Sequence, residues 1–222
     1  LGQWRKAGEE MKMISSKSSK QDGNVVLSFE KEMEIGAKYS LTYKINSEGK
    51  ILVFADYAPA KEGLPLMPKF GMKMLVNPEM DEITWYGRGI YENYPDRKSS
   101  EFIGEYSLPL DDFVVNYPAP QENGNRCDVR WMAFSDGKLN LRIEGLQPLC
   151  FRAWPWLEED IEKAGHPFEL PDRDFINVNI DLNIHGVGCN DGWGAQTLEK
   201  YTIDANKPYS YGFILSCEGE SK

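Results

Sequence analysis

The sequence is poor in histidine and has no closely spaced cysteines. Its 222 residues include two histidines and four cysteines, Cys127, Cys150, Cys189 and Cys217, with no Cys-x-x-Cys pair. This spacing excludes a zinc finger and leaves either reduced core thiols or disulfides of undecided pairing, of which we favour reduced thiols. Two histidines are also too few for a histidine-rich metal site.

Basic runs and long apolar runs are missing as well. The chain has 25 Lys and Arg residues against 35 Asp and Glu residues, a formal net charge of −10. Nucleic acids need clustered Lys and Arg side chains to neutralise their phosphates, and anionic membrane surfaces have the same need. No apolar run approaches the roughly 20 residues of a membrane span. We therefore expect neither nucleic acid nor a membrane as a partner.

The start of the chain has neither an initiator methionine nor a signal peptide. It opens at Leu1 with LGQWRKAGEE. Because such a start is typical of a piece cut from a longer protein, the missing targeting signals say nothing of the compartment.

Helical patterns are scarce, whereas alternation of apolar and polar residues is frequent. Only region 155–166 predicts a helix, with early acidic residues and Gly165 as its stop. The alternating regions predict strands at 24–34, 39–47, 50–59, 68–89 with a break at Asn77–Pro78, 125–145 as a hairpin, 175–188 and 209–218. About a dozen strands with so little helix predict an all-β fold, a sandwich or a barrel, in one domain spanning residues 1–222.

The glycine-rich stretch HGVGCNDGWG at residues 185–194 is a candidate loop for placing a metal ion, a catalytic residue or the ring of Trp193. His185, Cys189 and Asp191 are the obvious set for a metal, but a metal site needs three or four correctly aimed ligands, and we predict none here. A nucleophilic Cys189 paired with His185 lacks a visible orienting group. Trp193 lies between two glycines, which let the backbone turn sharply and present the indole ring to a sugar face. The alternative is that Trp193 closes one end of the sandwich.

Four sets of neighbouring carboxylates are formal candidates for a general acid and base pair. The pairs are Asp111 with Asp112, Glu158 with Glu159, Asp172 with Asp174, and Glu92 with Asp96. In a chain with 35 acidic residues such neighbours arise by chance, and Asp111 suits a helix start or a turn. We therefore interpret most of these acids as solvated or capping residues.

The stretch GIYENYPDR at residues 89–97 combines tyrosine, proline and polar side chains. Asn93 and Arg97 could donate hydrogen bonds to a ligand. The interpretation that we favour is a rigid corner, in which Pro95 fixes the turn and Arg97 binds carboxylates or carbonyls of the same domain.

Several of these stretches together resemble a known domain. YENYPDR, QENGNRC, LPL and NID…GVGCNDGWG are similar to the C-terminal β-sandwich domain of family-two glycoside hydrolases, the large bacterial β-galactosidases, and to the small subunit of two-chain β-galactosidases. The resemblance extends from Trp4 to Glu218. It implies a large antiparallel supersandwich related to the galactose-mutarotase fold, and a chain truncated at its N-terminal edge.

The resemblance also implies that this domain caps a TIM barrel with both catalytic glutamates. No such barrel fits in these 222 residues, so we expect no catalytic residue in this chain and no activity from it alone. The magnesium and sodium ions of the family are implied for the barrel, and no cofactor is expected here. The implied partners are a β-galactoside, the chain's own barrel and neighbouring subunits.

Two departures from the family pattern concern the loops. Gly89-Ile90 stands where the family reads Gly-Pro, and residues 188–193 read GCNDGW where the family reads Gly-Gly-Asp followed by Ser-Trp. The tryptophan is kept, so the family's role of stacking on the aglycone half of the substrate falls on Trp193. Asn93, Arg97 and Asp191 are expected to support the loops.

Two other functions fit the same residues less well. A free-standing carbohydrate-binding module would have several exposed aromatic residues in line, and only Trp193 is convincing. An epimerase-like enzyme would need a catalytic histidine and glutamate in a central cleft, whereas His166 lies in a loop beside Pro167.

Overall fold

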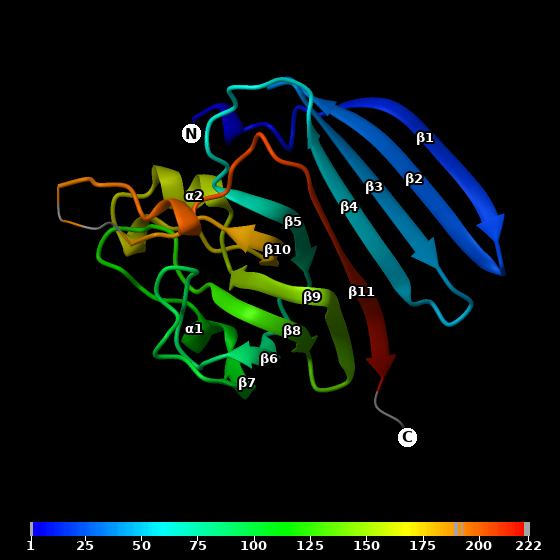
Figure 1. Ribbon diagram of the computed structural model, residues 1–222. Coiled ribbons are helices and arrows are strands. Elements are labelled where there is room, and N and C mark those ends of the chain that lie inside the picture. Colours follow the sequence, from blue (N-terminus) through cyan, green and yellow to red (C-terminus); the bar gives the residue numbers. More distant parts are fainter. Residues whose placement is uncertain (1, 189–190, 192, 220–222) are drawn as a thin grey trace.

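The computed structural model describes residues 2–188, 191 and 193–219 of the chain (Figure 1). Strands dominate this part of the molecule, and all of the paired strands are antiparallel. The strands are β1 Lys12–Gln21, β2 Asn24–Met33, β3 Ala37–Ile45, β4 Ile51–Pro59, β5 Lys69–Val76, β6 Glu82–Arg88, β7 Ile103–Pro109, β8 Arg126–Ser135, β9 Leu139–Trp154, β10 Ile176–Ile184 and β11 Tyr209–Gly219. The short helices are α1 Leu110–Phe113 and α2 Glu158–Lys163, with 3-10 turns η1 Gly2–Trp4, η2 Pro167–Glu169 and η3 Glu199–Tyr201.

The strands form one bent sheet with two arms. Its order is β1-β2-β3-β4-β11-β9-β8-β6-β7, and β10 pairs with both β9 and β5. The long strand β9 belongs to both arms, because its residues 139–145 pair with β11 and its residues 150–154 pair with β10. In Figure 1 the arm of β1–β4 and β11 lies on the right and the arm of β5–β10 on the left. This antiparallel all-β architecture confirms the predicted fold class.

Aromatic side chains fill the space between the arms. Phe70 of β5 lies 5.4 Å from the ring of Tyr211 in β11 and 5.9 Å from that of Tyr57 in β4, measured between centroids. Farther along, Trp85 and Phe113 pack 5.5 Å apart in an edge-to-face arrangement. Such pairs are favourable beyond the apolar area that they bury. The core is therefore continuous from the right arm to the left.

The predicted strands and helix are present. All seven predicted strand regions contain strands, with the break at Asn77–Pro78 between β5 and β6, and α2 lies inside region 155–166. The β8–β9 turn has Gly137 at φ +80°, as the tight Ser-Asp-Gly connection requires. Asp111 and Asp112 lie in the first turn of α1, where acidic side chains are favourable.

Two strands, β1 and β7, are not predicted by the sequence pattern. β1 is almost wholly polar and exposed, so it lacks the apolar alternation that reveals a strand. It pairs with β2 through a two-residue turn, Asp22-Gly23, in which both φ angles are positive. β7 is an edge strand of seven residues with a half-exposed pattern. Among the described residues no helix is long and apolar enough to cross a membrane.

The central strand β10 separates two different environments. Ile176, Val178 and Ile180 point into the apolar core, whereas the alternate residues Asn177 and Asn179 point to the opposite face. That second face is also buried. Asn177 donates to Trp156 O at 2.9 Å, and Asn179 accepts from a buried arginine, so loops cover this polar face instead of water.

Candidate functional site

The glycine-rich segment follows β10 and presents Trp193 to solvent. The exposed fraction of Trp193 is 95%, the highest among the large apolar residues described. Asp191 Oδ1 accepts hydrogen bonds from the backbone N–H groups of Trp193 at 2.8 Å and Ala195 at 3.2 Å. The tryptophan thus projects from a turn closed by the Asp191 carboxylate, and its ring is free to stack against a planar or apolar surface.

The histidine of this segment is held by protein groups. His185 donates its backbone N–H to Pro68 O at 2.8 Å, and its ring Nδ1 lies 2.7 Å from Gly186 O. Cys189, the residue considered as a nucleophile or metal ligand beside it, lies outside the described residues. Among those described, no group of three or more His, Cys, Asp or Glu side chains could hold a metal ion.

Asn93 is a structural residue of the 89–97 segment. Its side chain is fully buried, so its amide faces protein instead of a ligand. Oδ1 accepts from Cys127 N at 2.9 Å and Nδ2 donates to Tyr91 O at 3.1 Å. The backbone of Asn93 is in turn bound on both sides by Asn125, through its carbonyl oxygen and its side-chain amide, each at 2.7 Å. This geometry matches the rigid corner.

Arg97 supports the same corner from the surface. Its Nη2 donates to Glu92 Oε1 at 2.6 Å, and its guanidinium lies 4.9 Å from the ring centroid of Tyr94. Glu92 Oε2 accepts from Gly124 N at 2.7 Å, and Glu92 Oε1 accepts from the Tyr117 hydroxyl. Glu92 is therefore committed to holding the 117–124 segment, which removes it from the candidate catalytic acids.

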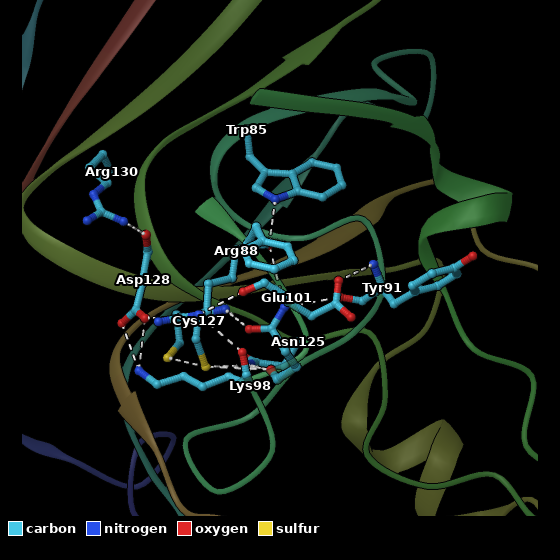
Figure 2. A network of polar contacts seen from close by, with 12 residues as sticks. Trp85, Arg88, Tyr91, Lys98, Glu101, Asn125, Cys127, Asp128 and Arg130 are labelled. Atoms are coloured by element: carbon cyan, nitrogen blue, oxygen red, sulfur yellow. Dashed lines mark hydrogen bonds and ion pairs between the residues drawn. The ribbon is translucent and has the colours of Figure 1, made fainter. Parts of the chain in front are cut away.

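Figure 2 shows the polar network at the base of this corner. Asp128 accepts from Arg88 Nε at 2.5 Å and from Lys98 Nζ at 2.9 Å. Burial opposes ionisation of Asp128, yet the hydrogen bonds of Arg88 and Lys98 hold the pKa of its carboxyl below the usual range. Arg88 also donates to Glu101 O at 2.7 Å, which brings the two ends of the 89–101 segment together. Sequence reasoning did not find this network, because its members are spread over three elements.

The thiols beside this network are reduced. Cys127 and Cys150 are buried with their Sγ atoms 3.5 Å apart, and Cys217 is a free exposed thiol. The hydrogen bond with Cys127, together with burial, raises the pKa of the Cys150 thiol. Cys150 is therefore a poor nucleophile, and since both thiols are buried this pair has a packing role.

The carboxyl groups of the polar face are arranged as ion pairs. Arg152 is 2% exposed in its side chain and binds Glu122, and its Nη2 lies 2.6 Å from Glu158 Oε1. Burial opposes ionisation of Glu158, but Lys69 and Arg152 hold its pKa well below the usual range. A permanently ionised carboxylate of this kind does not serve as a general acid. Asp181 has its pKa raised to about 6 by burial, but it is 2% exposed and out of reach of a substrate.

Asp96 joins the two segments that the sequence singled out separately. Its carboxylate accepts hydrogen bonds from residues on both sides of Trp193, including Gly188 N at 2.6 Å. In the sequence Asp96 stands out only as a neighbour of Glu92. The signal that could have found it is the run of glycines 90 residues later, which leaves room for a side chain from elsewhere.

Comparison with known proteins identifies the family. The family model of the beta galactosidase small chain matches residues 1–215. The chain is 33% identical to a beta-galactosidase of Priestia megaterium over 96% of its own length, and 31% identical to one of Pseudoalteromonas haloplanktis over 97%. It spans about a fifth of these relatives, 21% and 20% of their lengths.

Solved structures with a similar course of the chain are sugar epimerases and their homologues. A galactose 1-epimerase of Lactobacillus acidophilus is 10% identical, with a TM-score of 0.49 over 92% of this chain and 66% of the epimerase. An aldose epimerase homologue from C. elegans is 9% identical, with a TM-score of 0.49 over 92% of this chain and 68% of the homologue. The match of the family model over nearly the whole chain decides the assignment. The chain belongs to the beta galactosidase small chain family.

Proposed function

We propose that this chain is the small-chain domain of a β-galactosidase that hydrolyses terminal β-D-galactosides. In this proposal it contributes a stacking surface for the aglycone, the part of the substrate beyond the galactosyl ring. The observation that carries the proposal is the exposed indole of Trp193 on a turn closed by Asp191. Indole faces bind the apolar C–H faces of sugars, and an exposed tryptophan on a structured turn offers such a face.

The chemistry of hydrolysis belongs to another part of the whole enzyme. Retaining and inverting glycosidases both need two carboxyl groups that flank the scissile bond. Three of the carboxylates considered above are engaged otherwise: Glu92 binds Gly124 N, Glu158 lies among cations, and Asp181 is buried. We place the catalytic glutamates, and the magnesium and sodium ions of the family, in a barrel outside this chain.

The test is Trp193→Ala in the longer enzyme. Stacking covers about 50–100 Å² of apolar sugar surface, which corresponds to about 1–2.5 kcal/mol or about a 5- to 70-fold change in affinity. Glucose, an aglycone sugar, should weaken as an inhibitor by that factor, while galactose should weaken less than about twofold. Trp193→Phe should recover part of the loss, because a smaller flat ring still stacks.

The matched control is Ile14→Ala, which trims an exposed apolar side chain in β1. Ile14 is exposed and belongs to β1 in the right arm of Figure 1, whereas β10, which precedes the glycine-rich segment, lies in the left arm. Equal weakening of glucose and galactose would assign the segment a structural role only. No change in either constant would place Trp193 outside the substrate site and favour a sugar-binding module without a catalytic partner.

A further inference from the structure

Asp96 is the side chain that ties the 89–97 corner to the Trp193 segment. We propose that Asp96 is a positioning residue for aglycone binding, which holds both ends of the segment that carries Trp193. This inference rests on the proposed function. Asp96 does not touch the sugar in this proposal and acts only through the backbone that presents the indole.

The turn that carries Asp96 is rigid. Tyr94 and Arg97 exchange backbone hydrogen bonds, at 2.9 Å from Arg97 N to Tyr94 O and at 3.3 Å in the other direction. Pro95 fixes the backbone between them. The Tyr94 ring is fully buried and its hydroxyl donates to Glu122 Oε1 at 3.2 Å, so the turn is anchored in the core. The carboxylate of Asp96 is thus presented at one fixed place.

Three donors converge on this carboxylate from both sides of the tryptophan. Oδ1 accepts from Val187 N at 3.2 Å, and Oδ2 accepts from Gly188 N at 2.6 Å and from Thr197 Oγ1 at 3.3 Å. Val187 and Gly188 precede Trp193, and Thr197 follows it. A carboxylate has only acceptor positions, so it satisfies three donors that a neutral amide would satisfy in part. Hydrogen bonds to an ionised acceptor are also the stronger kind.

The glycines of the segment are explained by the same carboxylate. A Cβ atom on Gly186 would lie 2.7 Å from Asp96 Cγ, and one on Gly188 would lie 2.8 Å from Asp96 Oδ2. Real Cβ contacts are not that short, so any larger residue would push the carboxylate away. The two glycines and Asp96 therefore form one unit, in which the backbone approaches the acid closely because no side chain intervenes.

The two acids near Trp193 bind different parts of the segment. Asp191 closes the turn around the tryptophan itself, through Trp193 N and Ala195 N. Asp96 binds the loop residues that lead into and out of that turn. Holding a ring in its bound orientation before binding reduces the conformational entropy that is lost on binding. Loss of Asp96 should therefore weaken aglycone binding without changing the indole.

The experiment compares Asp96→Ala and Asp96→Asn in the longer enzyme that contains this domain. Two readouts are taken: amide hydrogen exchange of Val187 and Gly188, and inhibition by glucose and by galactose. In Asp96→Ala both amides should exchange at least about tenfold faster, because their acceptor is gone. Glucose inhibition should weaken about fivefold and galactose inhibition less than about twofold. Asp96→Asn, which keeps one acceptor, should fall between the wild type and Asp96→Ala.

The matched control is Asp112→Asn, the same chemical change at an exposed acid of α1, which should alter neither readout. A double variant completes the test. If Asp96 acts through Trp193, then Asp96→Ala should add nothing to the loss of glucose affinity in Trp193→Ala.

The possible failures have different signatures. Unchanged exchange in Asp96→Ala overturns the anchoring role, whatever Trp193 does. Equal weakening of glucose and galactose, or full additivity with Trp193→Ala, also overturns the proposal, since either means a general disturbance. If exchange accelerates but neither Trp193→Ala nor Asp96→Ala alters glucose inhibition, the proposed function itself has failed.

Discussion

Strands β1 and β10 are both rich in polar residues, yet their surroundings are opposite. β1 is an edge strand with nearly every side chain exposed, whereas β10 pairs on both sides and nearly all of its side chains are buried. On β1 water satisfies the lysines and serines. On β10 the polar side chains are satisfied by loops, because buried polar groups need partners. Polar composition therefore does not decide whether a strand is exposed.

The difference explains where the candidate site can form. The polar face of β10 binds Arg152, which in turn binds Glu122 of a covering loop and Glu158 at the start of α2. Tyr94 reaches the same Glu122 from the 89–97 corner. The loops that support Trp193 are thus tied to a buried strand through a chain of ion pairs and hydrogen bonds. β1 has no such layer over it in the described part of the chain.

The largest effect in this comparison is expected from Arg152→Ala. The substitution removes the buried cation that binds Glu122 and Glu158, and it removes the donor to Asn179 Oδ1. Breaking a buried ion pair by removing one partner costs about 3–5 kcal/mol. Urea unfolding of the 222-residue chain should show a fall in the free energy of unfolding of this size. A fall below about 1 kcal/mol would mean that water reaches this face and that β10 resembles β1 after all.

Asp181 gives an intermediate effect with a defined pH dependence. Burial raises the pKa of its carboxyl from 3.8 to about 6 in the folded chain, so the folded state keeps the proton when the unfolded state has lost it. Stability contributed by this group is therefore full below about pH 4 and is lost as the pH rises to about 6. The loss above that pH is about 3 kcal/mol, because one pKa unit corresponds to about 1.4 kcal/mol.

Asp181→Asn removes this loss, since the amide does not ionise. The stability of the variant relative to the wild type should be about 1 kcal/mol greater at about pH 7.5 than at about pH 5. Urea unfolding of both proteins at these two pH values measures the difference. Asp136→Asn is the control, because Asp136 is an exposed acid of the β8–β9 turn whose pKa is lowered by backbone N–H groups. A pH-independent difference for Asp181→Asn would show that Asp181 is not buried as an acid.

The contrast between exposed and buried strands also decides which strands can be predicted from the sequence. Strands with an apolar alternation, such as β3 and β4, are visible because one face enters the core. β1 is invisible, since only its hydrogen bonds to β2 make it a strand. The exposure of Trp193 was predicted from its flanking glycines, and the rigid corner from Pro95. The Asp96 contact was not, because residues about 90 positions apart meet only through the fold.

The smallest effect is expected from Lys17→Ala in β1. Lys17 is exposed and has Ser28 of β2 as its cross-strand neighbour, so its removal leaves no buried group without a partner. Exposed substitutions of this kind change the free energy of unfolding by no more than about 0.5 kcal/mol. The measurement should be made on the 222-residue chain by urea unfolding and on the longer enzyme by thermal inactivation. A marked loss in the longer enzyme alone would mean that another part of that protein covers β1, and that β1 and β10 differ only in what covers them.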